Sequence, residues 1–361
     1  MKIAIDCRMS GLSGIGVYLD NLLEIILSES RNNSYLLIGN ENRLRQYEHL
    51  PYCEILHSDL SIFSFKEMFL FPVKDINKCD VFYSPNYNIP AGVKIPVFST
   101  IHDIVFLDVD GLTSVIGKFI RKLFLWRAIK ISKVIFTVSV FSKKRINYHF
   151  NTKKPIVVTY NSIRSNLKKF SSSNQSAFDF PYIVYVGNIK KHKGLGNLLE
   201  AYTTIDNKNF HHKLVIIGSA DNFKTKDVAI NKLIKSQNNS NIIFTGKIDD
   251  EQLYTVLTHA SLLVQPSIYE GFGIPPLEAL YLRCNALVSD IPVFHEIYDD
   301  LPVTFFDINN IDDLKDKITS CVKNSKAVDV KNKIDEKYNT HNTVNLILNS
   351  MYSHINCLQE N

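Results

Sequence analysis

Short runs of apolar and β-branched residues, separated by longer stretches with helical spacing, most constrain what this chain can fold into. The first half contains KIAID, SYLLIG, VFYS, VFSTIHD, KVIFTVS and PIVVTYNS. A second series follows with YIVYVG, KLVIIGS, NIIFTG, SLLVQPS, NALVSD and PVTFFD. This alternation predicts an α/β fold in which parallel sheets are flanked by helices.

A polar, low-complexity stretch between Ser165 and Pro181 separates the two series and is the best candidate for a linker. The 361 residues, 45% of them hydrophobic, suffice for two domains. We expect Rossmann-like domains over 1–165 and 175–330, with ligands bound beyond the carboxyl ends of the strands, in a cleft between the halves. The segment 331–361 predicts a helix that packs back on the first domain. Its apolar positions are Val344, Ile347, Leu348, Met351 and Ile355.

Composition excludes several classes of protein. A net charge of +5, from 41 basic and 36 acidic residues, does not indicate a nucleic-acid binder but is compatible with anionic substrates or an anionic membrane. The six cysteines lack CxxC or metal-ligand spacing, as expected for reduced thiols in the cytosol. Asp6 and Arg8 interrupt the apolar run that a signal peptide needs, and no stretch approaches the roughly 18 apolar residues of a membrane span. We therefore expect a cytoplasmic, soluble protein.

The sharpest motif, SIYEGFGIPPLEA over 267–279, follows the run SLLVQPS and leads into a helix. Gly271 and Gly273 let backbone amides approach a ligand closely, and the amino end of a helix favours a phosphate. Glu278 lies about one turn inside that helix, where its carboxylate could accept hydrogen bonds from ribose hydroxyls. Glu270, before the turn, could hold the hydroxyls of a transferred sugar. The structural alternative is an ordinary strand, turn and helix.

Other motifs follow predicted strands. VGNIKKHKG over 186–194 follows the first strand of the second half, and SGIGVY over 13–18 forms a predicted glycine-rich turn before a helix from Leu19 to Leu27. His102 and Asp103 close the strand PVFSTIHD, so both side chains should enter the cleft. Three further residues are assigned structural or coincidental roles: Ser142 caps a helix, and Asp108 and Asp110 imitate a metal motif within a loop.

Together these motifs resemble family-4 retaining glycosyltransferases, and the resemblance extends across most of the chain. They match the EGFG-x-P-x-x-E, VG-x(n)-RKG/N, GIGRY and HD elements of that family. The resemblance implies the GT-B fold, with two Rossmann-like domains whose parallel sheets face each other across a cleft. It also implies a nucleotide-sugar donor as substrate, no cofactor and no bound metal.

The resemblance implies four catalytic residues: His102, Asp103, Lys193 and Glu270. It implies donor contacts from Gly14, Gly16, Gly187, Asn188, His192, Lys193, Glu270, Gly271, Phe272, Gly273, Ile274 and Glu278. In these roles Lys193 stabilises the departing diphosphate and His102 binds the donor sugar near its 6-position. Asp103 orients the imidazole or contacts the acceptor. The acceptor hydroxyl then attacks from the face that the diphosphate leaves, with the leaving phosphate assisting.

The chain departs from the family pattern at two places. The arginine that usually accompanies Lys193 is matched by His192, or loosely by Lys190 or Lys191, which removes a bidentate fork. Val17 replaces the common arginine of the glycine turn. Structural roles remain the alternatives: a solvent-facing turn for Lys190 and Lys191, a connecting turn for 13–18, and a structural histidine at 102.

The acceptor side offers one clue, GKFIRKLFLWRAIKISK over 117–133, in which basic and aromatic residues interleave as in an interfacial amphipathic helix. With SIFSFKEMFLFPVK it could dock on an anionic leaflet; a core helix with a solvated basic face is the alternative. The resemblance is greatest to bacterial O-antigen and capsule enzymes, including mannosyltransferases that use GDP-mannose. It implies an undecaprenyl-diphosphate-linked oligosaccharide acceptor. The rival functions are an epimerase or hydrolase of nucleotide sugars and a non-catalytic nucleotide-sugar-binding protein.

Overall fold

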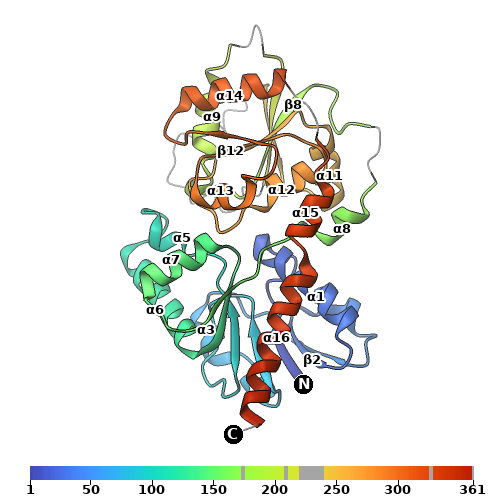
Figure 1. The fold of residues 1–361 in the computed structure, drawn as a ribbon, viewed down its shortest axis with the longest axis vertical. Coiled ribbons are helices and arrows are strands. Elements are labelled where there is room, and N and C mark those ends of the chain that lie inside the picture. Colours follow the sequence, from blue (N-terminus) through green and yellow to red (C-terminus); the bar gives the residue numbers. More distant parts are fainter. Residues whose placement is uncertain (172–174, 207–209, 219–239, 325–327, 360–361) are drawn as a thin grey trace. The chain divides into compact units, whose positions relative to one another are not determined.

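The computed structural model describes residues 1–171, 175–206, 210–218, 240–324 and 328–359. The chain divides into two compact units, one made of Met1–Ser162 with Tyr338–Asn361 and the other of Ile163–Lys337 (Figure 1). Each unit is built around its own parallel sheet, which confirms the predicted α/β class. Residues 172–174 of the predicted linker and Ser219 of the run KLVIIGS lie outside the described residues.

The first unit holds a seven-stranded sheet in the order β3-β2-β1-β4-β5-β6-β7. All pairings between these strands are parallel. The central strands β4 and β5 are buried along their length, because helices cover both faces of such a sheet. The strands are β1 Lys2–Asp6, β2 Ser34–Gly39, β3 Cys53–His57, β4 Val81–Ser84, β5 Val97–Thr100, β6 Ser132–Thr137 and β7 Ile156–Val158.

The helices of the first unit pack on this sheet around two buried clusters. Val97 and Ala128 belong to one cluster, and Leu125 and Ile135 belong to the other. The helices are α1 Ser13–Glu29, α2 Glu41–Leu44, α3 Phe65–Leu70, α4 Val73–Ile76, α5 Val105–Asp108, α6 Val115–Ile131, α7 Val140–Phe150 and α16 Thr340–Gln359, with a 3-10 turn η1 at Arg45–Tyr47.

The second unit holds a six-stranded parallel sheet in the order β10-β9-β8-β11-β12-β13. Counted from its own first strand, this is the order 3-2-1-4-5-6 of a dinucleotide-binding fold. The strands are β8 Tyr182–Val186, β9 Lys213–Ile217, β10 Ile242–Gly246, β11 Leu262–Gln265, β12 Ala286–Ser289 and β13 Val303–Phe306.

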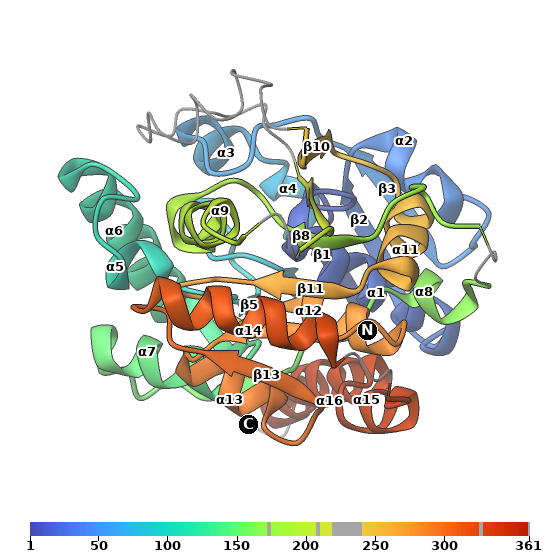
Figure 2. The same ribbon diagram turned by 90° about the horizontal axis from the view of Figure 1, so that it is seen from above.

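Helices α9 and α14 of the second unit lie side by side over its sheet (Figure 2). Leu198 of α9 and Leu314 of α14 join one buried cluster with Val264 of the sheet. Helix α12 contacts β11, β12 and α15. The helices are α8 Ser165–Lys169, α9 Leu195–Thr203, α11 Asp250–His259, α12 Ile274–Tyr281, α13 Pro292–Tyr298, α14 Ile311–Lys323 and α15 Lys331–Lys337, with a 3-10 turn η2 at Lys191–Lys193.

The boundaries between units differ from the predicted 1–165, 175–330 and 331–361. The first unit ends at Ser162, so α8 and the polar stretch after it belong to the second unit. The C-terminal segment is divided, because α15 belongs to the second unit and α16 to the first, where it packs on α1. Val344, Ile347, Leu348 and Met351 form the buried stripe of α16.

The sequence pattern did not predict one of the described strands, β3. β3 is an edge strand whose Glu54 and His57 are exposed, so it lacks the continuous apolar run of the inner strands. An edge strand pairs with a neighbour on one side only and is less buried than an inner strand, so polar and apolar residues are mixed in its sequence.

The predicted glycine turn at 13–18 was wrong, because α1 begins at Ser13 rather than near Leu19. Gly14 and Gly16 therefore lie in the first turn of the helix. A β-carbon at Gly16 would come within 2.4 Å of the Met9 carbonyl oxygen, whereas one at Gly14 would meet nothing within 4 Å. Gly16 thus has a packing reason to be glycine, and Gly14 has none.

These two glycines give a matched pair of variants. Gly16→Ala forces the helix away from Met9 and should lower the free energy of unfolding by about 1–3 kcal/mol. Gly14→Ala should be neutral or stabilising by up to about 1 kcal/mol, because alanine favours helix. Urea denaturation of both variants measures the difference; equal effects would contradict this packing.

Candidate active site

In the second unit, Lys193 and Glu270 form an ion pair beyond the carboxyl ends of the strands. Lys193 ends η2, which lies between β8 and α9, and Glu270 lies between β11 and α12. The Nζ atom of Lys193 is 2.7 Å from both carboxylate oxygens of Glu270. Two residues that the sequence assigned to one site are therefore in direct contact.

The Glu270 carboxylate is also held from β11 and the segment that follows it. Ser267 donates a hydrogen bond to Oε1 of Glu270 at 2.8 Å, and Gln265 donates to Ser267 at 2.8 Å and to Glu270 at 3.5 Å. All three side chains are buried. Sequence reasoning missed Gln265 and Ser267, although polar residues at the end of an apolar strand were the available signal.

Gly194 fixes how the turn with Lys193 lies against the segment with Glu270. Its backbone has φ +69°, and a β-carbon there would lie 1.7 Å from the carbonyl oxygen of Pro266. The carbonyl of buried His192 accepts a hydrogen bond from the backbone amide of Ile268 at 2.8 Å. Close backbone contact, which only glycine permits, therefore brings the two charged side chains together.

The amino end of α12 adjoins Glu270. Gly273, at φ +93°, caps the helix, and a β-carbon there would lie 2.5 Å from the ring of Phe294. Tyr298 donates a hydrogen bond to the Gly273 carbonyl. The neighbouring candidates Gly271, Phe272 and Ile274 are buried at the same place. A helix amino terminus provides backbone donors and a partial positive charge, which suit a phosphate.

Glu278 has a partner that the sequence did not reveal. Nη1 of Arg164 lies 2.5 Å from its Oε2, and the Arg164 backbone amide lies 3.3 Å from its Oε1. Burial raises the pKa of Glu278, and the charge of Arg164 opposes that rise. Arg164 also lies 3.4 Å from Asp250. The carboxylate predicted to face a ribose is thus already engaged within the second unit.

Gly187 and Asn188 follow β8 at the same edge of the sheet. Gly218 packs so closely that its β-carbon would lie 2.0 Å from the Gly187 carbonyl oxygen. Asn188 is exposed, and its carbonyl accepts hydrogen bonds from Lys190 and from the hydroxyl of Tyr185. Bare backbone therefore lines this edge near β8 and β9.

In the first unit, His102 follows β5 and is half-buried. Its Nε2 lies 3.0 Å from the carbonyl oxygen of Pro85, and the ring packs edge-on against Tyr18 at 4.9 Å between centroids. Burial lowers the pKa of His102 to about 4. The ring is therefore neutral at pH 7, and because a carbonyl only accepts, the proton resides on Nε2 and Nδ1 is an acceptor.

One predicted role near His102 requires correction. Asp103, predicted to orient the imidazole or to contact the acceptor, accepts a hydrogen bond from the Val105 amide at 3.1 Å, and its predicted role stays a prediction. The cap of α7 is Ser139, which accepts from the Ser142 amide at 3.0 Å, rather than Ser142 itself. Ser142 instead donates to the His102 carbonyl at 3.1 Å, so it supports the backbone of the site.

A buried charge cluster at the end of β1 was also missed. Arg8 contacts Asp6 at 2.7 Å and Glu67 at 2.6 Å, and its guanidinium lies over the ring of Phe71. Burial raises the pKa of Glu67 to about 7, against the opposing charge of Arg8. Among the described residues, Oε1 of Glu67 is buried without a hydrogen-bond partner. One cation between two carboxylates ties α3 to β1.

The remaining acidic motif is structural. Asp108 ends α5 instead of lying in a loop, and it contacts Arg145 at 2.5 Å and His149 at 2.7 Å. Asp110 contacts Lys118 at 3.1 Å. In the described part of the chain, no group of three or more His, Cys, Asp or Glu is placed to hold a metal ion.

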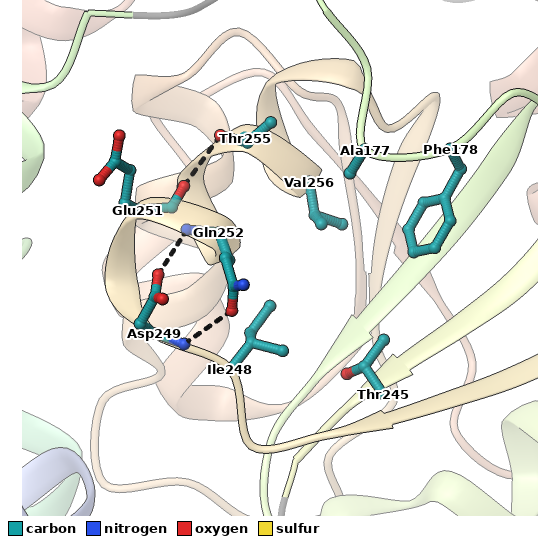
Figure 3. Close-up of a pocket in the computed structure, with 9 residues that line it drawn as sticks. All are labelled: Ala177, Phe178, Thr245, Ile248, Asp249, Glu251, Gln252, Thr255 and Val256. Atoms are coloured by element: carbon teal, nitrogen blue, oxygen red, sulfur yellow. Dashed lines mark hydrogen bonds between the residues drawn. The ribbon is translucent and has the colours of Figure 1, made fainter.

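A cavity of about 390 Å³ lies beside α11, lined by Ala177, Phe178, Thr245 and the first turns of that helix (Figure 3). Asp249 and Gln252 point to one another there, because they form the capping box that starts α11. The cavity contains neither Lys193 nor Glu270. Its polar groups serve the helix, so the ion pair, rather than this cavity, marks the candidate site.

Comparison with known proteins matches residues 167–339 to the family model described as "Glycosyl transferases group 1". The O-antigen chain mannosyltransferase RfbU of Salmonella typhimurium is 29% identical over 234 residues, 61% of this chain and 62% of the relative. The O-antigen biosynthesis glycosyltransferase WclY of Escherichia coli is 28% identical over 243 residues, 64% of each chain. The chain therefore spans less than two thirds of the length of these relatives.

Solved structures confirm the GT-B fold. Sucrose-phosphate synthase from Thermosynechococcus elongatus has a TM-score of 0.77 at 16% identity, covering 99% of this chain and 100% of that one. HepE from Anabaena, solved in complex with UDP-glucose, has a TM-score of 0.75 at 14% identity, covering 98% and 100%. The resemblance to group 1 glycosyltransferases and O-antigen mannosyltransferases is thus confirmed, while the cleft between the two units stays a prediction.

The lowered pKa of His102 predicts a loss of stability in acid. The folded pKa of about 4 lies below the ordinary value of 6.5, so the unfolded chain takes up the proton first. Neutral His102 therefore contributes to the free energy of unfolding above pH 6.5. This contribution is lost as the pH falls from 6.5 to about 4, by at most about 3 kcal/mol.

His102→Gln removes this titration. Between those pH values, the free energy of unfolding of the variant should fall less steeply than that of the wild type, as measured by urea denaturation at several pH values. Parallel curves would contradict a half-buried His102 that stays neutral when the chain is folded.

Proposed function

We propose that this chain is a retaining, metal-independent glycosyltransferase acting in bacterial O-antigen or capsule synthesis. It transfers a hexose, mannose in the first instance, from a GDP-sugar to an undecaprenyl-diphosphate-linked oligosaccharide. The observation that carries the proposal is the Lys193–Glu270 pair beside the amino end of α12. The group 1 match over 167–339 and the names of RfbU and WclY support the same activity.

Lys193 is the proposed cation for the donor diphosphate. An ammonium group has three donors, and Glu270 accepts two of them, so one remains for a phosphate oxygen. As the bond to the sugar breaks, negative charge grows on the leaving oxygen, and a cation already held in position stabilises it without reorganisation. The first-turn amides of α12 would share that charge. His192, Gly187, Asn188, Gly14 and Gly16 stay proposed donor contacts.

Glu270 is the proposed ligand of the sugar hydroxyls. Lys193, Ser267 and Gln265 fix its carboxylate, which has acceptor capacity left for a hydroxyl. Gln265 and Ser267 are positioning residues in this scheme, because they act through Glu270. Neutral His102, which presents Nδ1 as an acceptor, is the proposed partner of the hydroxyl at the sugar 6-position, with Asp103 beside it.

The proposed reaction is a front-face substitution. The acceptor hydroxyl attacks the anomeric carbon on the side that the diphosphate leaves, and its proton passes to the leaving phosphate, so the anomeric configuration is kept. Glu270 binds the sugar and forms no covalent bond to it. Glu278, held by Arg164, stays the proposed contact of the ribose hydroxyls.

Such an acceptor places the enzyme in the cytoplasm, at the inner face of the cytoplasmic membrane. Contact with that membrane through residues 117–133 is part of the proposal. None of the described helices is long and apolar enough to cross a membrane.

A panel of GDP-, UDP-, dTDP- and ADP-sugars, in EDTA, tests the donor site by thermal unfolding. A ligand that binds only the folded chain raises its melting temperature, so we expect a shift with a GDP-sugar and no need for metal. Lys193→Ala should lose the shift, because a charge-assisted hydrogen bond worth about 1.5–3 kcal/mol is removed. Lys191→Ala is the matched control, since Lys191 is exposed in the same turn.

Three outcomes would contradict parts of the proposal. A shift that requires a divalent cation would refute metal independence, and no shift with any nucleotide sugar would favour a scaffold protein with a decayed site. Donor consumption without an acceptor would favour an epimerase or a hydrolase.

A further inference from the structure

Most of the large hydrophobic side chains exposed among the described residues gather on two helices of the first unit, α3 and α6. On α6 they are Val115, Ile116, Phe119, Leu123 and Trp126, with Val115 87% and Phe119 69% exposed. Four of these recur three or four positions apart, so they form one face of the helix. The opposite face, with Leu125, Ala128 and Ile129, packs into the core.

Helix α3 lies beside α6 and carries exposed apolar side chains of its own. Phe65, Phe69 and Leu70 are all more than half exposed, and the Phe65 ring lies 6.0 Å from that of Phe124 in α6. We call the exposed apolar side chains of α3 and α6 the docking surface. Burial of large apolar side chains is favourable, so this surface leaves binding free energy unused. Exposed apolar side chains gathered on two neighbouring helices indicate a contact with a partner or a membrane.

The charged residues of α3 and α6 indicate what kind of partner binds the docking surface. Helix α6 contains no acidic residue, whereas Arg121, Lys122 and Lys130 are exposed on it, and Lys66 is exposed on α3. Lys118 is paired with Asp110, and Glu67 is buried against Arg8, so neither acidic residue offsets those four cations. An occupant of this surface must therefore be both apolar and anionic.

A second copy of this chain fits poorly. In a two-fold contact the same surface meets itself, which would bring the cations of both copies together. A bilayer with anionic headgroups meets both demands, because acyl chains receive the aromatic side chains while phosphates receive the cations. Trp126 combines the two features, since Lys130 lies over its ring at 4.9 Å.

We propose that the docking surface of α3 and α6 binds the surface of an anionic lipid bilayer, with Phe119, Trp126 and Phe69 entering the interface. This inference rests on the membrane contact in the proposed function and deepens it, because it names the side chains of α3 and α6 that make the contact. It does not depend on the donor, because vesicle binding needs no sugar nucleotide.

Flotation of the full chain with vesicles tests the inference. Vesicles of phosphatidylcholine with phosphatidylglycerol should bind the protein at roughly 0.1 M salt, and binding should weaken at roughly 1 M salt, where charges are screened. Vesicles of phosphatidylcholine alone should bind at least tenfold more weakly.

Two variants, each with a matched control, separate the apolar and charged contributions. Ile116→Ser with Phe119→Ser should weaken binding at least tenfold, while Leu346→Ser with Tyr148→Ser, exposed elsewhere on the same unit, should not. Arg121→Glu with Lys122→Glu should also weaken binding at least tenfold. Lys94→Glu with Lys153→Glu makes the same change of net charge on other exposed lysines and should have little effect.

Failure of the wild type to bind anionic vesicles at low salt would overturn the inference, as would equal losses in the controls. Self-association abolished by Ile116→Ser with Phe119→Ser, without vesicle binding, would assign the surface to a subunit interface. The thermal shift with a GDP-sugar should be unchanged in all four variants, so failure here and failure of the proposed function are distinguishable.

Discussion

The contact between Gly194 and the carbonyl oxygen of Pro266 determines how the candidate site is assembled. A β-carbon would lie 1.7 Å from that oxygen, so only glycine lets the turn with Lys193 approach the end of β11. The hydrogen bond from Ile268 to the His192 carbonyl then fixes the two segments together. Lys193 and Glu270 are held at 2.7 Å by the backbone around them rather than by their own attraction alone.

The topology explains why these segments meet. In a parallel sheet the carboxyl ends of all strands lie at the same edge. The order β10-β9-β8-β11 makes β8 and β11 neighbours, although their first residues, Tyr182 and Leu262, are 80 positions apart in the sequence. The turns after these two strands must therefore lie side by side. The same rule brings His102, after β5, to the corresponding edge of the first sheet.

The sequence pattern predicted nearly all the described strands, because the inner strands of a covered sheet are mostly apolar. It missed β3, an edge strand with exposed Glu54 and His57. It identified Lys193 and Glu270 through motifs, but not Arg164 beside Glu278, which contacts it from 114 positions away. The pattern also placed the start of α1 too late, because glycine residues usually indicate a turn. Gly16 is glycine for another reason, its close packing on the Met9 carbonyl oxygen, and the sequence around it does not reveal that contact.

In the proposed site Lys193 binds the diphosphate and Glu270 binds the sugar. Calorimetric titration of Lys193→Ala and Glu270→Gln with GDP and with GDP-mannose separates these two roles. We expect Lys193→Ala to weaken binding of both ligands, whereas Glu270→Gln should weaken binding of GDP-mannose and leave that of GDP nearly unchanged. Equal weakening of both ligands by Glu270→Gln would show that Glu270 merely supports Lys193 and would contradict the assignment.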